Sequence, residues 1–412
     1  MTPSRTLVCL CVIALAVPLT RPFAARAATH DPRTTPAASL PLLGGDGVRL
    51  YVQEAYEGFS PAVTRAVAGR YAELVEAGMD NARHLFDWSD LQPEIGEVDT
   101  GFVREAMRER TRAGIAHQFV NITVVDTAGP ESLPGFVNEL LEAGVAWDDP
   151  RIVVPFTRVL DEVVPIALEH GAYMIGFANE PGSYYEEEPV AAASFTRFVE
   201  AAIAHTRTIS DELATTVVFA GVADAGVPEL MPLIDVASFN HYAYALETDT
   251  GCEYEGFRLP HYRSVGSEAI GPILDEMVRA AGGRLVCIQE FGQATGWNDA
   301  PATLGDRAGL ALQREVMVAF AEELAARSDR FRTVCLWTLN DHTREGMAWV
   351  YDAIVSEGLP PCYAQNIAEI FGPTGLVRSD ERATKKPAFD AVRDAIATLR
   401  ERGGSRDTPA RD

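Results

Sequence analysis

Two glutamates stand at the ends of short apolar stretches that lie far apart in the chain. Glu180 ends the segment YMIGFANE (173–180), and Glu290 ends the segment RLVCIQE (284–290). Burying a carboxylate is unfavourable unless a site needs it, because the charge loses its hydration. Two buried strands that each end in a glutamate are what a two-carboxylate active site at one face of a parallel barrel would require.

Eight apolar segments alternate with helical patterns along most of the chain. The expected strands cover residues 48–53, 81–86, 118–125, 173–180, 216–220, 235–240, 284–290 and 332–338. They are continuous apolar runs, which is typical of parallel strands buried on both faces. Eight such units over roughly 350 residues predict a single (β/α)8 TIM barrel with long βα loops. An open doubly wound sheet is the alternative, but no glycine-rich phosphate turn follows the first strand.

Helices are expected between the strands, where apolar residues recur at helical spacing. The predicted helices cover residues 61–77, 101–113, 133–141, 149–170, 190–210, 227–233, 267–281, 307–327 and 385–400. Gly78 and Gly114 directly follow two of these patterns and are typical helix stops. Strands and helices in alternation place the chain in the α/β class.

The N-terminal 27 residues resemble a secretory signal peptide. A short basic start (1–5) is followed by an apolar run (6–19) and by the tripeptide ARA (25–27), which fits a small-x-small cleavage site. The apolar run is shorter than the roughly 20 residues that a membrane-spanning helix needs, and Pro18 interrupts it. We therefore expect cleavage after Ala27 and a secreted protein, either extracellular or periplasmic, with no membrane contact afterwards.

The remainder of the chain is expected to form one catalytic domain over residues 46–402. Residues 28–45 are rich in Thr, Pro and Ala and are expected to be flexible, and residues 403–412 are expected to be a disordered tail. The formal net charge of -24 argues against nucleic acid and anionic membranes as partners. A neutral carbohydrate would not be repelled by this charge.

Four cysteines remain after removal of the predicted signal peptide. Cys252 and Cys362 lie in loop-like segments, and because export permits disulfides, we expect these two to pair. Cys287 and Cys335 lie inside predicted strands and are expected to be free core thiols. The cysteine spacing does not resemble a zinc site, and we expect neither a metal nor a cofactor.

Polar and aromatic residues cluster where the predicted strands end, which is the active face of such a barrel. They are Arg83, Asn179, Glu180, His241, Tyr242, Tyr244, Glu290 and Trp337, and Trp88 lies in the loop after the second strand. This set suits a sugar, because carboxylates transfer protons, an amide binds a hydroxyl group and an indole stacks on a pyranose. Each alone has a structural reading: Glu180 could start a helix with Pro181, and Arg83 could be an ion-pair partner. Their joint placement favours a carbohydrate site.

The order of these residues resembles clan A of the retaining (β/α)8 glycoside hydrolases. The resemblance covers nearly the whole chain after the signal peptide and rests on the motifs NEP (179–181) and QEFG (289–292), with KPAF (386–389) similar to the last helix of many clan members. It implies that Glu180 is the general acid/base and that Glu290 is the nucleophile.

The resemblance also implies roles for the surrounding side chains. Asn179 would bind the 2-hydroxyl of the sugar being cleaved, Arg83 would support the nucleophile electrostatically, and Trp337 would form the floor of the subsite. Tyr242 would hold Glu290 ionised and oriented, although the segment NHYAY (240–244) leaves Tyr244 as an alternative partner.

Two further residues are included among the substrate-binding candidates. His241 lies beside Tyr242 at the end of the sixth strand, and Trp88 lies in a loop expected at the active face. His241 also has a structural alternative, as a histidine with its hydrogen bonds satisfied.

Together these observations predict a secreted retaining β-glycoside hydrolase. It would cleave the O-glycosidic bonds of a β-linked oligo- or polysaccharide by a two-glutamate double displacement, which requires carboxyl groups about 5–5.5 Å apart. A transglycosylase on the same scaffold and a non-catalytic glycan-binding barrel are the alternatives. The presence of both glutamates and of Asn179 argues against a decayed site.

Overall fold

The computed structural model describes most of the chain after its N-terminal segment. The described residues are 48–54, 60–126, 132–247, 252–254, 257–259, 261–295, 306–356 and 358–404. The predicted signal peptide and flexible segment lie outside the described residues, as do residues 405–412 of the predicted tail. Gly403 and Gly404, which we expected in that tail, are instead the last residues of a helix.

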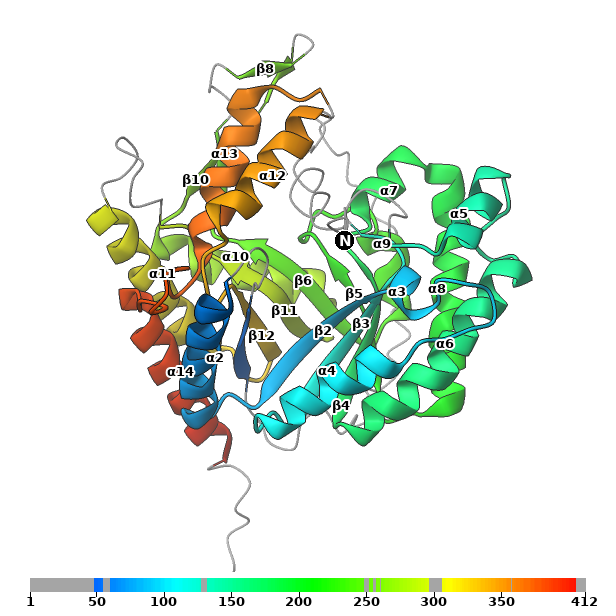
Figure 1. The fold of residues 1–412 in the computed structure, drawn as a ribbon, viewed down its shortest axis with the longest axis horizontal. Helices are drawn as coiled ribbons and strands as arrows, with labels where there is room; N and C mark the ends of the chain where they lie inside the picture. The colour runs from blue at the N-terminus through cyan, green and yellow to red at the C-terminus, as the bar shows by residue number, and fades with distance from the viewer. Residues whose placement is uncertain are drawn as a thin grey trace, which may run out of the picture.

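Eight parallel strands form one sheet at the centre of the molecule (Figure 1). They are β1 (Arg49–Gln53), β2 (Asn81–Asp87), β3 (His117–Thr123), β4 (Ala172–Asn179), β5 (Ala214–Phe219), β6 (Val236–Tyr242), β11 (Leu285–Gly292) and β12 (Phe331–Trp337). Their order in the sheet is β1-β12-β11-β6-β5-β4-β3-β2, and the two end strands contact each other. Each strand overlaps a predicted segment, so the predicted (β/α)8 barrel is confirmed.

Helices follow the strands and form the outer layer (Figure 1). The longer ones are α2 (Pro61–Glu76), α4 (Gly101–Arg112), α6 (Pro150–Glu169), α8 (Pro189–Ile209), α10 (Ile270–Ala280), α11 (Asp306–Ala326) and α14 (Pro387–Gly404). The shorter ones are α3 (Trp88–Leu91), α5 (Gly135–Glu142), α7 (Gly182–Glu187), α9 (Val227–Leu230) and the 3-10 turns η1 (Met231–Leu233), η2 (Ser267–Ala269) and η3 (Gly372–Thr374). Within the described part of the chain, no helix combines the length and apolarity needed to cross a bilayer.

The barrel interior changes from apolar to polar along its axis. A small apolar cluster of residues from β3, β4, β5, β6 and β11 packs inside the barrel and comprises Phe119, Tyr173, Met174, Ala214, Val218, Val236 and Cys287. Towards the carboxyl ends of the strands, Arg83, Asn179, Asn240 and Glu290 are buried instead. The polar groups near the carboxyl ends of the strands therefore lie beyond this apolar cluster.

Two helices and two small strand pairs that we did not predict stand beyond the carboxyl ends of the barrel strands (Figure 1). β7 (Tyr244–Glu247), β8 (Glu253–Tyr254), β9 (Phe257–Arg258) and β10 (His261–Ser264) follow β6, and α12 (Arg344–Ser356) and α13 (Pro361–Phe371) follow β12. Their buried residues form a separate apolar core of Cys252, Met347, Val350, Ile354, Tyr363, Ala364, Ile367, Ile370 and Phe371. We call these six elements the hairpin module.

The predicted disulfide between Cys252 and Cys362 is confirmed. It joins the segment before β8 to α13 across 110 residues of sequence. A cross-link over so long a loop stabilises the folded state by roughly 4–5 kcal/mol in the chain-entropy model, because it restricts the unfolded chain. Cys287 and Cys335 are free and buried, as expected.

Candidate active site

Glu290 lies near the carboxyl end of β11 and is held by two donors. Arg83 of β2 donates from Nη1 to Glu290 Oε1 over 3.0 Å, and the hydroxyl of Tyr242 on β6 donates to Oε2 over 2.5 Å. Arg83 and Glu290 are both buried, with 4% of each exposed. Burial lowers the pKa of Arg83. The interactions with its neighbours, of which that with the Glu290 carboxylate is the largest, raise it by more, so the pKa of Arg83 is raised overall. A guanidinium and a hydroxyl on one carboxylate stabilise its negative form and fix its orientation.

Glu180 follows β4 directly and lies where its charge is disfavoured. Its side chain is buried, and Asn240 of β6 donates from Nδ2 to Glu180 Oε1 over 2.7 Å. The pKa of Glu180 is raised well above the usual value, first by burial and second by the negative charge of Glu290, while the Asn240 hydrogen bond opposes the rise. Glu180 therefore keeps its proton at pH values where an ordinary glutamate is ionised.

The backbone of Glu180 has a φ of 50°, in the left-handed region that residues with a side chain rarely adopt. Such a conformation costs roughly 1 kcal/mol or more and persists only when the surroundings enforce it. Here the Glu180 amide donates to the carbonyl oxygen of Val218 over 2.7 Å. The turn aims the carboxyl group from the end of one strand into the site.

The loop after β5 clamps the turn that carries Glu180. Asp224 is partly buried and accepts hydrogen bonds from the backbone amides of Ala220 and Gly226, over 2.9 and 2.8 Å. A Cβ atom on Gly182 would lie 2.6 Å from the Asp224 carboxyl group, so only glycine permits this contact. Burial raises the pKa of Asp224 to about 6, although these backbone donors lower it.

Asn179 connects the two glutamates through hydrogen bonds. Its Oδ1 accepts from Arg83 Nη2 over 3.3 Å and from Asn240 Nδ2 over 3.5 Å, and its own Nδ2 donates to Asp126 Oδ1 over 2.8 Å. Because Arg83 also binds Glu290 and Asn240 also binds Glu180, an unbroken chain of contacts runs from one carboxyl group to the other.

Asn240 and Asp126 are two site residues that the sequence reasoning missed. A signal for Asn240 existed: side chains two residues apart on a strand share a face, so a site containing Tyr242 also contains residue 240. Asp126 lies beyond the end of β3 and directly follows the predicted strand 118–125, and no residue there was included among the candidates.

The structure brings five predicted site residues into one hydrogen-bonded group: Arg83, Asn179, Glu180, Tyr242 and Glu290. Trp337 ends β12, the neighbour of β11 in the sheet, and its indole is partly exposed. Tyr244 is not the partner of Glu290, because its hydroxyl donates to the carbonyl oxygen of Ile370 over 3.0 Å.

The structure places two predicted substrate contacts away from the two carboxyl groups. The His241 ring stacks on Phe291, whose ring stacks in turn on Phe320 of α11, so His241 faces the helix layer rather than the carboxyl groups. Burial lowers the pKa of His241 to about 4. Trp88 is fully buried against Phe156, with ring centroids 4.8 Å apart, and cannot stack on a sugar.

Comparison with known proteins gives a likeness in fold. No protein-family model and no curated protein sequence matches the chain. Among solved structures, a variant of a GH5_18 protein from Bifidobacterium longum subsp. longum in complex with Manβ1-4GlcNAc matches with a TM-score of 0.58 and 12% identity, covering 86% of this chain and 78% of that one. A GH5_18 protein from Bifidobacterium longum subsp. infantis matches with a TM-score of 0.55 and 15% identity, covering 88% and 80%.

A third structure is an exo-β-1,4-mannosidase from Opitutaceae bacterium strain TAV5. It matches with a TM-score of 0.55 and 14% identity. The match covers 86% of this chain but only 60% of the length of the mannosidase. At these identities the three matches establish the shared fold. They confirm the barrel that the resemblance to clan A glycoside hydrolases implied.

The buried ion pair gives a prediction for stability. Arg83→Met leaves the Glu290 carboxylate buried without its cation, so the free energy of unfolding should fall by about 3–5 kcal/mol. Urea denaturation measures this change. Arg104→Met is the matched control, because Arg104 pairs with Glu169 on the surface and its loss should cost less than about 1 kcal/mol. Equal losses in the two variants would contradict the account of Arg83.

The raised pKa of Glu180 gives a prediction for the pH dependence of stability. Because the folded state holds the Glu180 proton more tightly than the unfolded state, Glu180 destabilises the fold increasingly as the pH rises above about 4. Glu180→Gln should therefore unfold at a higher urea concentration than the wild type at pH 7, and this gain should vanish below about pH 4. Glu169→Gln, at an exposed position, should show no such trend. A gain independent of pH would contradict the protonated state of Glu180.

Proposed function

We propose that the protein is a retaining β-glycoside hydrolase that acts on a β-linked oligo- or polysaccharide. The observation that carries the proposal is the contrast between two neighbouring carboxyl groups. Glu290 receives a guanidinium and a tyrosine hydroxyl, whereas the pKa of Glu180 is raised by burial and by the charge of Glu290. One ionised and one protonated carboxyl group are the two forms that a double displacement needs.

In the first step, the Glu290 carboxylate attacks the anomeric carbon of the bound sugar. A covalent ester bond forms to this carbon as its bond to the glycosidic oxygen breaks. Glu180 gives its proton to that oxygen, so the leaving group departs as a neutral alcohol. Arg83 and Tyr242 hold the attacking carboxylate in place until it reacts.

In the second step, the roles of the two carboxyl groups change. The ester at Glu290 carries no negative charge, so the second-largest cause of the raised pKa of Glu180 disappears. Glu180, now ionised, takes a proton from water, and the hydroxide oxygen replaces Glu290 at the anomeric carbon. Two displacements at one carbon restore the β configuration.

Recognition of the sugar falls to the residues around the glutamates. The second Nδ2 hydrogen of Asn179 is the proposed donor to the 2-hydroxyl group, because its first hydrogen bonds Asp126. Trp337 offers a partly exposed indole for stacking. The disaccharide Manβ1-4GlcNAc in one structural neighbour, and the activity in the name of another, support a β-linked substrate.

Replacing the nucleophile tests this proposal. Glu290→Ala should lower the turnover of aryl β-glycosides by several orders of magnitude, because the ester intermediate cannot form. Added azide should restore part of the activity and yield the α-glycosyl azide, since azide attacks once, from the face that Glu290 occupied. The configuration of the product is read by NMR.

A second glutamate variant and a surface variant serve as controls. Glu180→Ala should retain more activity on substrates with acidic leaving groups than on others, and azide should then yield the β product. Glu169→Gln should keep the activity of the wild type. Full activity in Glu290→Ala would refute the assignment of the nucleophile, and a wild type that turns over no aryl β-glycoside or β-linked polysaccharide would refute the proposed function.

We further propose that the protein is secreted after cleavage behind Ala27. The signal-like N-terminal sequence and the disulfide support this proposal. The exported protein should begin at Ala28 on N-terminal sequencing. It should also contain two titratable thiols in denaturant, from Cys287 and Cys335, and four after reduction. Protein found only inside the cell with an intact N-terminus would contradict secretion.

A further inference from the structure

We infer that Phe371 is a positioning residue for the nucleophile, which it orients through Tyr242. The inference rests on the proposed function, because Tyr242 matters only if Glu290 reacts. Phe371 is the last residue of α13, so a side chain of the hairpin module, outside the barrel, would set the geometry at the end of β11.

The Tyr242 ring is fixed by contacts on several sides. A Cβ atom on Gly292 would lie 2.9 Å from this ring, which therefore packs directly on the backbone that follows the nucleophile. Tyr244 stacks parallel to Tyr242, with ring centroids 6.0 Å apart. Phe371 meets Tyr242 edge to face, with centroids 5.0 Å apart and planes at 79°. Of these contacts, only the one with Phe371 comes from an element that is distant in sequence from both Tyr242 and Glu290.

The module side of Phe371 is anchored in three ways. Phe371 belongs to the apolar core of the hairpin module, and the disulfide at Cys362 ties the beginning of α13 to the segment before β8. Asn366 of α13 binds the backbone of Tyr262 on β10 through both ends of its amide, over 2.8 and 3.3 Å. The hydroxyl of Tyr244 reaches the carbonyl oxygen of Ile370, the residue before Phe371.

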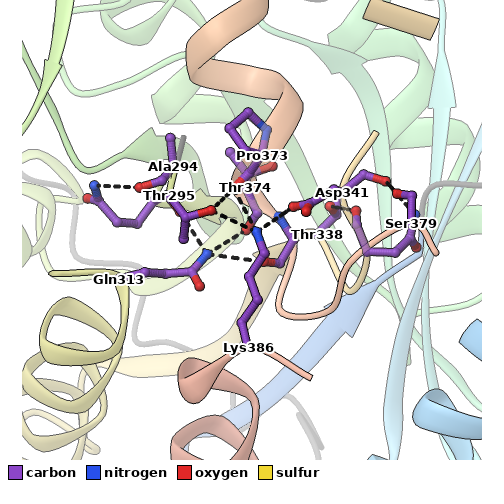
Figure 2. A network of polar contacts seen from close by, with 12 residues as sticks. Ala294, Thr295, Gln313, Thr338, Asp341, Pro373, Thr374, Ser379 and Lys386 are labelled. Atoms are coloured by element: carbon purple, nitrogen blue, oxygen red, sulfur yellow. Dashed lines mark hydrogen bonds and ion pairs between the residues drawn. The ribbon is translucent and has the colours of Figure 1, made fainter. Parts of the chain in front are cut away.

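On the other side, a buried polar network holds the turn that follows Phe371 (Figure 2). Lys386 Nζ donates to the carbonyl oxygen of Pro373 over 3.0 Å, to Thr295 Oγ1 over 2.9 Å and to Asp341 Oδ1 over 2.6 Å. Thr295 follows β11, and Asp341 follows β12. The network therefore fixes the position of Phe371 relative to the two strands that carry Glu290 and Trp337.

Lys386 also explains a motif that the catalytic assignment left unused. Gln313 of α11 donates from Nε2 to the carbonyl oxygens of Thr374 and Gly375, over 3.0 and 3.1 Å, so the same turn is held from a second element (Figure 2). The KPAF segment (386–389) thus supplies the cation that locks the turn after α13, just before α14 begins at Pro387.

The contact that Phe371 protects tolerates little movement. The Tyr242 hydroxyl lies 2.5 Å from Glu290 Oε2, at the end of a rigid ring, so a small tilt of the ring removes the donor. A misplacement of about 1 Å near reacting groups can cost roughly a hundredfold in rate. The edge-to-face contact with Phe371 opposes that tilt.

The decisive test is Phe371→Leu, which keeps an apolar side chain of moderate size but removes the ring edge. We expect kcat on an activated aryl β-glycoside to fall by roughly ten- to a hundredfold with little change in KM. In a Tyr242→Phe background, which lacks the hydroxyl, Phe371→Leu should cause no further loss, because its effect passes through that hydroxyl. Ile354→Ala, which trims the same module core on α12, should leave kcat nearly unchanged.

Structural measurements separate this inference from the proposed function. A crystal structure of Phe371→Leu should show the Tyr242 hydroxyl displaced from Glu290 Oε2, whether or not a substrate has been found. Thermal unfolding shows that the variants compared are folded. An unchanged Tyr242–Glu290 contact, a normal kcat, or losses that add fully to those of Tyr242→Phe would overturn the role of Phe371. A wild type without glycosidase activity would instead refute the proposed function.

Discussion

The repulsion between two carboxyl groups in a buried site is the constraint on which this structure depends. Glu180 and Glu290 meet at the carboxyl end of the barrel, where little water is available to screen them. Two negative charges there would be very costly, so one group is paired with a cation and the other keeps a proton. Arg83 determines which of the two groups is ionised, because it pairs with Glu290. Glu180 instead accepts a hydrogen bond from the uncharged amide of Asn240.

The backbone is irregular at both glutamates. Glu180 adopts a left-handed conformation after β4, and β11 has an irregular register between Ile288 and Glu290. Both irregularities lie at the strand ends that carry the glutamates. Departures from regular geometry at a few positions are typical of sites whose surroundings enforce a functional conformation.

The sequence predicted the barrel well, because buried parallel strands leave long apolar runs that helical segments separate. It predicted the two glutamates for a related reason, since a carboxylate directly after such a run is unusual. Trp88 and His241 were misplaced because position near a strand end does not reveal which face a side chain occupies. The hairpin module escaped prediction because α12 and α13 pack on one another and on short strands, so their pattern does not follow the βα repeat.

The barrel supplies the two carboxyl groups, and the hairpin module packs against the tyrosine that donates to one of them. The measurement that tests the central claim most directly is the trapping of the covalent intermediate with a 2-deoxy-2-fluoro β-glycoside that carries an activated leaving group. Peptide mass spectrometry should then find the fluoro sugar on Glu290 alone. A sugar attached to Glu180 or to another residue, or turnover of the substrate without any covalent adduct, would contradict the division of roles between Glu180 and Glu290.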